Sequence, residues 1–239
     1  MLISFFLCYM QQTDQVVQQM VILAQSWETA GDRRYIFLRC YSMMSANMAL
    51  AIQEGRFAHS SWVAALMLRF ADYYFDALER YDQNPVHAPA VWKQVHDAAR
   101  LPDTHVLQNL LLGVNAHINY DLPLALYDCL HSEWAGLDET HRRSRQNDHE
   151  TVNRIIGDTI DAVQDTVVEP LSPTMALVDR LMGRMDEWLL SQLITAWRQD
   201  VWQVALQLLS APDERHRQSI IKEQEDRVME RAGKLLESI

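Results

Sequence analysis

The sequence predicts an all-α protein, a single compact bundle of about eight helices. Apolar residues recur at three- and four-residue steps along most of the chain, which is the period of helices that bury one face. Only seven glycines and seven prolines occur among 239 residues, too few for the many turns of an all-β fold. With 49% apolar residues, the chain can bury one substantial core.

The first two helices are delimited by glycines. Apolar positions from Phe6 to Trp27 predict the first helix, and Gly31 breaks it. Asp32 is expected to cap a second helix, which Gly55 stops.

The next two helices are separated by a proline-containing loop. Ser60 can cap a third helix that runs through Tyr73. The stretch 82–89 contains two prolines and is predicted to be a loop, followed by a short helix around Trp92.

A long helix is predicted in the middle of the chain. Pro102 and Asp103 open it, and it should run to about Leu126, with Pro123 bending its last turns.

The second half contains a polar run and then further helices. Residues 138–148 are expected to be a surface loop or a frayed helix end, and Asp148 to cap a helix that reaches Val167. Prolines 170 and 173 end that helix. Apolar residues between 177 and 208 predict one long helix or two consecutive ones.

The C-terminal part differs from the rest in composition. Residues 1–210 are expected to form the helical domain. Residues 211–239 are highly charged with a thin apolar stripe, so they predict a peripheral helix, part of the same domain or partly disordered. Such a helix suits docking or dimerisation, and a homodimer is one expected assembly.

Charge and cysteine content exclude several classes of function. A net charge of −11 is unfavourable for binding nucleic acid or an anionic membrane surface. The apolar start, residues 1–10, is too short to span a bilayer and lacks a basic leader segment. Three scattered cysteines without a C-x-x-C pair indicate buried thiols in a reducing compartment. We therefore expect a soluble, cytoplasmic protein without nucleic-acid or membrane partners.

The helix over 106–125 has charge within its apolar stripe. At about 100° per residue, His117 and Asp121 fall among leucines and valines, four residues apart and therefore adjacent. Gly113 leaves room beside the imidazole. A carboxylate that faces a core is costly unless it is paired or hydrogen-bonded, so the core must be arranged around it.

Three arrangements would accommodate this pair. In a structural network, Asp121 orients His117 and the pair ties helices together. In a metal site, both bind a divalent cation such as Zn²⁺ with a further ligand. Asp72 is the first choice for that ligand. In metal-free acid–base chemistry, Asp121 raises the basicity of His117, and Asn115 or Asn119 holds a substrate oxygen.

The segment that contains this pair resembles a known family. Residues 115–122, N-A-H-I-N-Y-D-L, are similar to the N-A-H-I-N-x-D-L signature of a bacterial family known as domain of unknown function 5995. Softer likenesses occur at 32–39, 69–74, 148–153, 161–164 and 179–209. The resemblance covers nearly the whole chain. It implies an all-helical fold with a polar centre on the His117 helix and no known activity.

A weaker analogy concerns chemistry. The zinc-dependent phospholipase C and single-strand nuclease superfamily is all-helical and has an H-x-x-x-D ligand pair before Pro-Leu. Here Pro123 follows Asp121 too closely, and the next downstream histidine of that superfamily is missing. The analogy suggests metal-dependent hydrolysis.

Three further residues are candidates for substrate binding. Arg198 and Trp202 are four apart on one helix, which favours cation–π packing. Alternatively, Arg198 neutralises Asp121 or binds an anionic group of a substrate. Asn153 is expected at the edge of the core, either bonded to backbone or in contact with substrate.

The sequence leaves two functions open. The first is a small-molecule enzyme, a hydrolase or lyase, with His117 and Asp121 at the base of a pocket that holds a divalent metal or works without one. The second is a non-catalytic helical binding or scaffold protein in which the same pair is a structural network. No phosphate loop or G-x-S-x-G elbow is present to favour nucleotide-dependent transfer or a serine hydrolase.

Overall fold

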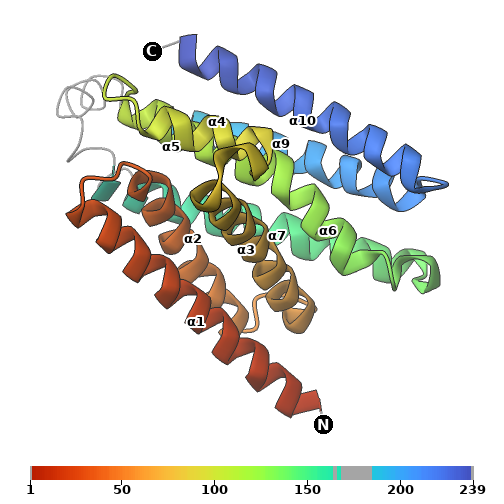
Figure 1. Cartoon of the computed structure of the whole chain (residues 1–239). Helices are drawn as coiled ribbons and strands as arrows, with labels where there is room; N and C mark the ends of the chain where they lie inside the picture. The colour runs from red at the N-terminus through yellow and green to blue at the C-terminus, as the bar shows by residue number, and fades with distance from the viewer. Residues whose placement is uncertain (1, 164–165, 168–184, 238–239) are drawn as a thin grey trace.

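The computed structural model describes residues 2–163, 166–167 and 185–237, and every regular element within these ranges is helical (Figure 1). The α-helices are α1 (Leu2–Thr29), α2 (Tyr35–Gln53), α3 (Ser60–Gln83), α4 (Ala90–Ala99), α5 (Val106–Ala116), α6 (Leu122–Leu130), α7 (Glu139–Val163), α9 (Met185–Ser210) and α10 (Glu214–Glu237). Short 3₁₀ turns span Pro85–His87 and Trp134–Gly136, and a π-helical turn spans His117–Asp121. The prediction of an all-α bundle is confirmed.

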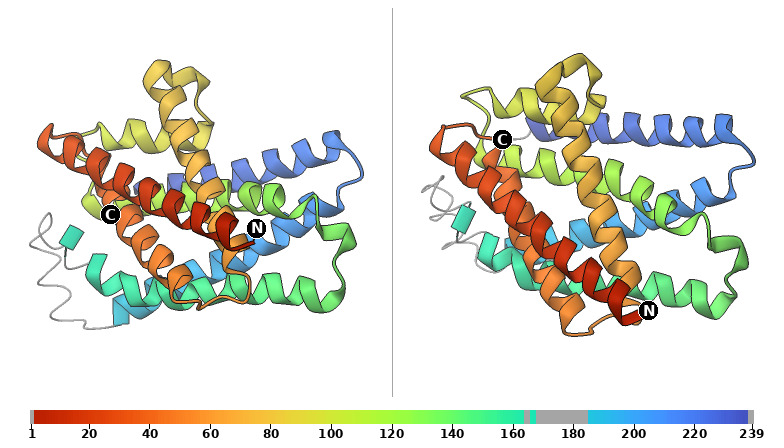
Figure 2. Two further views of the ribbon diagram at one scale, coloured as in Figure 1. Left: turned by 90° about the horizontal axis from the view of Figure 1, so that it is seen from below. Right: turned by 60° about the horizontal axis from the view of Figure 1, so that its bottom comes forward.

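The helices surround one central rod made of α5, the π turn and α6. This rod packs against α2, α3, α4, α9 and α10, whereas α1 lies on the outside against α2 and α3. Figure 2 shows α3 crossing the direction of α9 and α10, with α10 running beside α5. Side chains on the central rod can therefore contact most of the other helices of the bundle.

The core is divided into two hydrophobic clusters that meet on the central rod. Residues of α5, such as Leu110 and Ala116, belong to a cluster with α1, α2, α3, α4 and α10. Residues after α5, such as Ile118 and Leu126, belong to a cluster with α2, α3, α7 and α9. Val114 packs against both. The central rod therefore passes from one hydrophobic cluster to the other at the π turn.

Two glycines end helices as predicted. Gly31 and Gly55 have φ angles of 72° and 69°, the left-handed conformation that ends a helix and that side-chain-bearing residues rarely adopt.

Residues 139–148 of the polar run are helical, so of the two expected forms, a surface loop or a frayed helix end, the loop is wrong. The helix α7 begins at Glu139, and Asp138 accepts a hydrogen bond from the backbone N–H of His141 at 2.8 Å. Pairs four residues apart, such as Arg143 with Glu139 at 2.9 Å, support the solvated first turns. Most polar residues of this run form the solvent-exposed side of a helix.

Two other expected boundaries differ from the structure. The central helix begins at Val106 and not at Pro102, because His105 and Gln108 form a capping box there. Among the apolar positions predicted for the last core helices, those between 177 and 184 lie outside the described residues.

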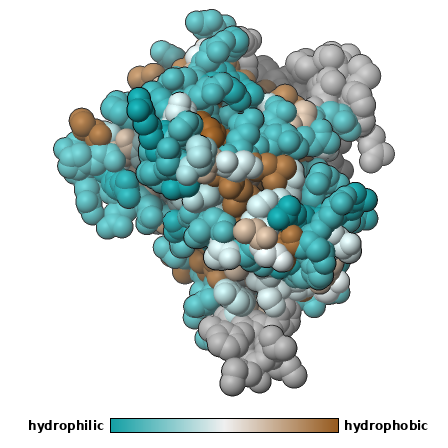
Figure 3. Space-filling model, turned by 90° about the vertical axis from the view of Figure 1, so that its right-hand side faces the viewer, coloured by the Kyte–Doolittle hydropathy of each residue, from teal (hydrophilic) through white to brown (hydrophobic). Residues whose placement is uncertain are grey.

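The C-terminal charged segment forms a docked helix. The helix α10 buries Gln224, Val228 and Ala232 against α4, α5 and α9. No helix of the described residues is long and apolar enough to cross a membrane. Figure 3 shows a face that hydrophilic side chains mostly cover, with small apolar areas between them.

Candidate functional site: a buried histidine–aspartate pair

His117 and Asp121 lie side by side in the π turn, as their spacing predicts. His117 Nδ1 is 2.9 Å from Asp121 Oδ2. The two residues are 3% and 1% exposed, so the pair is sealed inside the bundle. The pattern that placed charge in an apolar stripe thus identified a buried polar pair.

The π turn follows from Pro123. Proline has no N–H to donate to the carbonyl four residues before it, and its ring crowds that carbonyl. The turn takes wider bonding, in which the N–H of Leu122 reaches the carbonyl of His117. The released carbonyl of Asn119 accepts a 2.7 Å hydrogen bond from Gln224 Nε2 of α10. A single proline therefore both widens the turn and creates an attachment point for α10.

The carboxylate of Asp121 has a second partner on α4. The indole Nε1 of Trp92, a fully buried side chain, donates to both Asp121 oxygens at 3.1 and 3.0 Å. Together with His117, this contact joins α4 to the central rod and satisfies the oxygens that burial would otherwise leave bare.

Aromatic rings enclose the imidazole of His117. The Phe70 ring stacks on it with a centroid separation of 3.5 Å and an interplanar angle of 7°, and Tyr41 meets its edge at 4.3 Å. Three more rings lie within about 6 Å: Phe37, Tyr74 and Trp92. The Phe37 ring fits because residue 113 is a glycine: a Cβ there would lie 2.4 Å from Phe37 Cγ.

Burial controls the charge of the pair. It lowers the pKa of His117 well below its ordinary value and raises that of Asp121 well above its own, although the Trp92 hydrogen bond opposes the second shift. Tyr41 beside them has a raised pKa because of burial and the nearby Asp121 charge. His117 Nε2 is buried without a hydrogen-bond partner. The imidazole is therefore neutral and cannot exchange protons with solvent in this conformation.

A shallow depression beside the π turn does not reach the pair. It has about 180 Å³ of empty space, open to solvent, between the turn, α6, α9 and α10. Its lining includes Tyr120, Pro123 and Gln224, but neither His117 nor Asp121.

The donor set does not fit the expected divalent metal. The Asp72 side chain, the tentative third ligand, is 59% exposed and lies 3.8 Å from Arg69. The two oxygens of Asp121 already accept from Trp92. In the described ranges, no group of three or more His, Cys, Asp or Glu side chains could hold a metal ion. Asp72 is kept from the pair because it lies on the solvent side of α3.

The two asparagines of the signature point toward α10. Asn115 Nδ2 donates to the carbonyl of Val228 at 3.0 Å, and Asn119 Nδ2 donates to Asn115 Oδ1 at 3.1 Å. Gln108 Nε2 bonds the carbonyls of Leu235 and Leu236 in the same way. Asn115 and Gln108 thus bind the backbone of α10 and Asn119 binds Asn115, so the predicted role of the two asparagines in holding a substrate has no support from their orientation.

The predicted substrate-binding residues form a second cluster, between α7 and α9. Arg198 Nε donates to Asn153 Oδ1 at 2.8 Å. Its Nη2 donates to the carbonyl of His149 at 2.8 Å and lies 3.2 Å from His149 Nδ1. Trp202 packs on His149 with ring centroids 5.2 Å apart. The guanidinium turns toward α7 and not toward Asp121, so neither the expected cation–π contact with Trp202 nor the neutralisation of Asp121 occurs.

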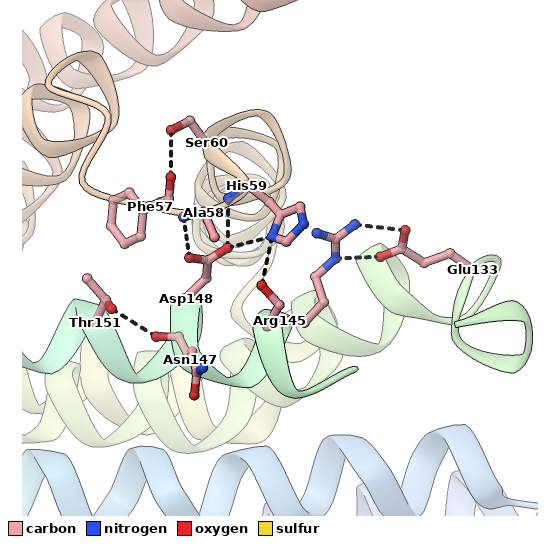
Figure 4. Close-up of polar contacts among 10 residues, drawn as sticks. Phe57, Ala58, His59, Ser60, Glu133, Arg145, Asn147, Asp148 and Thr151 are labelled. Atoms are coloured by element: carbon pink, nitrogen blue, oxygen red, sulfur yellow. Dashed lines mark hydrogen bonds and ion pairs between the residues drawn. The ribbon is translucent and has the colours of Figure 1, made fainter. Parts of the chain in front are cut away.

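Asp148 caps a helix, but not its own. It lies within α7 and accepts hydrogen bonds from the backbone N–H groups of Ala58 and His59 at 2.8 and 2.9 Å (Figure 4). These N–H groups belong to the N-cap residue of α3, His59, and to the residue before it. Figure 4 also shows Arg145 paired with Glu133 nearby. The prediction that Asp148 starts a helix is wrong, because capping here is a tertiary contact.

Several residues of these clusters were not expected from the sequence. The sequence assigns no role in the site to Trp92 or Phe70, and Gln224 lies in the segment predicted to be a peripheral helix. The sequence contained one usable signal, the Pro123 that follows the buried pair, because it predicts a released carbonyl near Asn119. The aromatic enclosure depends on helix packing, which periodicity alone does not define.

Comparisons with known proteins place the chain in a family. A family model described as "Family of unknown function (DUF5995)" matches residues 13–238. No curated protein and no solved structure matches the chain. The matched range includes the 115–122 signature and the helices that enclose its histidine. The chain therefore belongs to DUF5995, a family of unknown function.

Proposed function

We propose that this chain is a non-catalytic helical binding or scaffold protein, in which the His117–Asp121 pair is a structural network. The observation that carries the proposal is that both side chains of the pair are enclosed within the protein. Both side chains are buried, and their bonding partners come from the protein itself. A substrate would need access to the imidazole, and aromatic rings occupy the space around it.

The network has a clear mechanical role. It lies at the point where the two hydrophobic clusters meet, and it connects the central rod to α4 through Trp92 and to α3 through Phe70. The bonded groups of the pair, His117 Nδ1 and the Asp121 oxygens, favour one arrangement of the helices, since any other arrangement leaves them without partners.

The substitution His117→Ala tests this role. It removes the partner of a buried carboxylate and opens a cavity among aromatic rings, so we expect a loss of about 2–4 kcal/mol in the free energy of unfolding. Urea denaturation followed by tryptophan fluorescence measures it. The matched control, His131→Ala, removes an exposed imidazole at the end of α6 and should change stability by less than about 0.5 kcal/mol. Unchanged or increased stability of His117→Ala would contradict the proposal, because residues kept for chemistry can be replaced at no cost.

A second candidate, the small-molecule hydrolase or lyase, has two observations in its favour. His117 Nε2 is buried without a partner, and π turns occur frequently at functional sites. In this case Phe70, which is half-buried and stacked on the imidazole, acts as a gate. Deuterium exchange at the His117 ring C2 position tests access. Exchange as fast as that of exposed His131 in the unmodified chain would support the enzyme, whereas fast exchange only in Phe70→Ala supports the sealed network.

We also propose a cytoplasmic location. Cys40 and Cys129 are free, and burial raises the thiol pKa of each to about 12, which suppresses the thiolate that disulfide formation requires. Mass spectrometry of the isolated protein should find both thiols reduced.

A further inference from the structure

The cluster between α7 and α9 contains a buried positive charge without a negative partner. Arg198 is 5% exposed. Its hydrogen-bond acceptors are the amide oxygen of Asn153, the carbonyl of His149 and the Nδ1 of His149. Among the described residues, no carboxylate lies within ion-pair distance of the guanidinium. Every acceptor is neutral.

The protonation of His149 is fixed by its bonds. Its Nε2 lies 3.1 Å from the carbonyl of Arg198, and a carbonyl only accepts, so Nε2 carries the proton. Nδ1 then carries a lone pair, which accepts the hydrogen bond from Arg198 Nη2. Burial and the adjacent guanidinium lower the pKa of His149, which keeps the ring neutral. His149 therefore orients the guanidinium but does not compensate its charge.

Burying this cation without a carboxylate partner costs folding free energy, although the chain has 32 acidic residues that could supply one. Buried cations in proteins are normally paired, because losing water around an ion is far more expensive than losing it around a neutral group. Burial lowers the pKa of Arg198 to about 9, so the side chain remains charged at neutral pH. A neutral donor would have linked α7 to α9 without this cost.

Two donor groups of the cluster remain available. Arg198 uses Nε and Nη2 toward α7, and its Nη1 has no hydrogen-bond partner among the described residues. Asn153 accepts through Oδ1, and its Nδ2 is a donor that has no hydrogen-bond partner in the described ranges either. Asn153 is half-buried, which places this edge of the cluster near the surface.

We propose that Arg198 and Asn153 form an oxyanion-binding site, at which Arg198 Nη1 and Asn153 Nδ2 donate to a carboxylate or phosphate oxygen of a small ligand. The packing of Trp202 on His149, and of His149 against Arg198, holds the guanidinium in place before the ligand arrives. Such preorganisation reduces the entropy lost on binding. The inference rests on the proposed function only in treating the chain as a binding protein, and it adds the chemical class of the ligand.

The test is thermal unfolding of the full-length chain in inorganic phosphate or in acetate, with ionic strength held constant by sodium chloride. An anion bound only by the folded state should raise the melting temperature with the logarithm of its concentration above the dissociation constant, by about 5–10 °C at a concentration near 100 times that constant. A rise with acetate alone assigns the site to carboxylates, and a rise with phosphate alone assigns it to phosphates. No such rise above the sodium chloride control with either anion overturns the proposal.

Two variants separate the site from general salt effects. Arg198→Met keeps the length and apolar stem of the side chain and should abolish the rise. Arg145→Met removes an arginine that belongs to α7 and is already paired with Glu133 at 2.9 Å, and it should leave the rise intact. A rise that persists in Arg198→Met would overturn the proposal.

If Arg198→Met does not fold, Asn153→Leu supplies the same comparison at the half-buried edge, where at least a fivefold weaker apparent affinity is expected. The His117→Ala experiment concerns a different cluster, so either result can fail while the other stands.

Discussion

His96 is a buried histidine whose charge is suppressed by its surroundings. Its ring lies 4.7 Å from that of Tyr81 and 5.5 Å from that of Trp92, and its Nε2 is buried without a partner. Desolvation is the main cause that lowers its pKa from 6.5 to about 3. The folded protein therefore holds His96 neutral over a pH range in which the unfolded chain protonates it.

This shift predicts a loss of stability in acid. Below pH 6.5 the His96 imidazole binds a proton in the unfolded state but not in the folded state. The free energy of unfolding therefore falls as the pH decreases toward 3. The variant His96→Phe keeps the ring packing without the titration. Between pH 7 and 4.5 the parent chain should lose about 2 kcal/mol more than the variant. Urea denaturation at each pH measures the difference, and equal losses would show that His96 does not contribute.

At the scale of residues, the sequence predicted positions better than roles. The spacing of His117 and Asp121 within an apolar stripe correctly predicted an adjacent, buried pair. The roles of Asn115 and Asn119 could not be predicted, because Asn115 bonds the backbone of Val228 and the Asn119 carbonyl bonds the Gln224 side chain, each more than a hundred residues away in the sequence. Trp92 was likewise unpredictable as the partner of Asp121, since periodicity does not indicate which core side chains meet.

At the scale of elements, α5 and α2 approach closely at one glycine. The Phe37 ring of α2 occupies the space in which a side chain of residue 113 would lie. That ring is also part of the enclosure of His117, with centroids 5.8 Å apart. The close contact of the two helices and the geometry of the buried pair therefore depend on the same glycine.

A pair of glycine substitutions tests this dependence. Gly113→Ala should destabilise the protein by about 1–3 kcal/mol, because the new methyl group must displace a buried ring. Gly157→Ala in α7 has ordinary space, with Ser191 Oγ 3.8 Å away, and should gain up to about 1 kcal/mol from better helix propensity. Chemical denaturation of both variants measures the contrast. A gain in Gly113→Ala would mean that Phe37 moves freely.

The boundaries of the elements were predictable where they depend on local sequence. Glycine stops and the existence of most helices follow from nearby residues. The start of α3 is different, because the N–H groups of its N-cap residue and of the residue before it are bound by Asp148 from α7, far away along the chain. A capping residue identified by sequence alone is assigned to the helix that follows it, and here that assignment was wrong.

At the scale of the whole molecule, α10 is tied into the bundle by polar contacts. Amide side chains on the central rod bond the backbone of α10, and Gln224 bonds the backbone of the rod in return. The outer face of α10 is covered by charged pairs such as Lys222 with Glu225. The predicted homodimer through this helix stays a prediction.

These contacts predict that α10 unfolds together with the domain. Native-state hydrogen exchange should give the buried amides of α10 an opening free energy within about 1 kcal/mol of that of α5. In Asn115→Ala, which removes the bond to Val228, α10 should open earlier than α5 while the rest of the protein keeps its protection. Rapid exchange throughout α10 in the parent chain would instead identify it as a separate, peripheral segment.

The π turn also makes the length of the chain between α5 and α6 a constraint. A π turn accommodates about one more residue than an α turn, and each residue of an α-helix advances by about 100°. Deleting one residue between His117 and Asp121 would close the π turn to an α turn and break their four-residue spacing. A further insertion would rotate Leu122 and Leu126 away from the cluster that they share with α9. Related chains should therefore vary in composition around His117 far more readily than in the number of residues that separate it from α6.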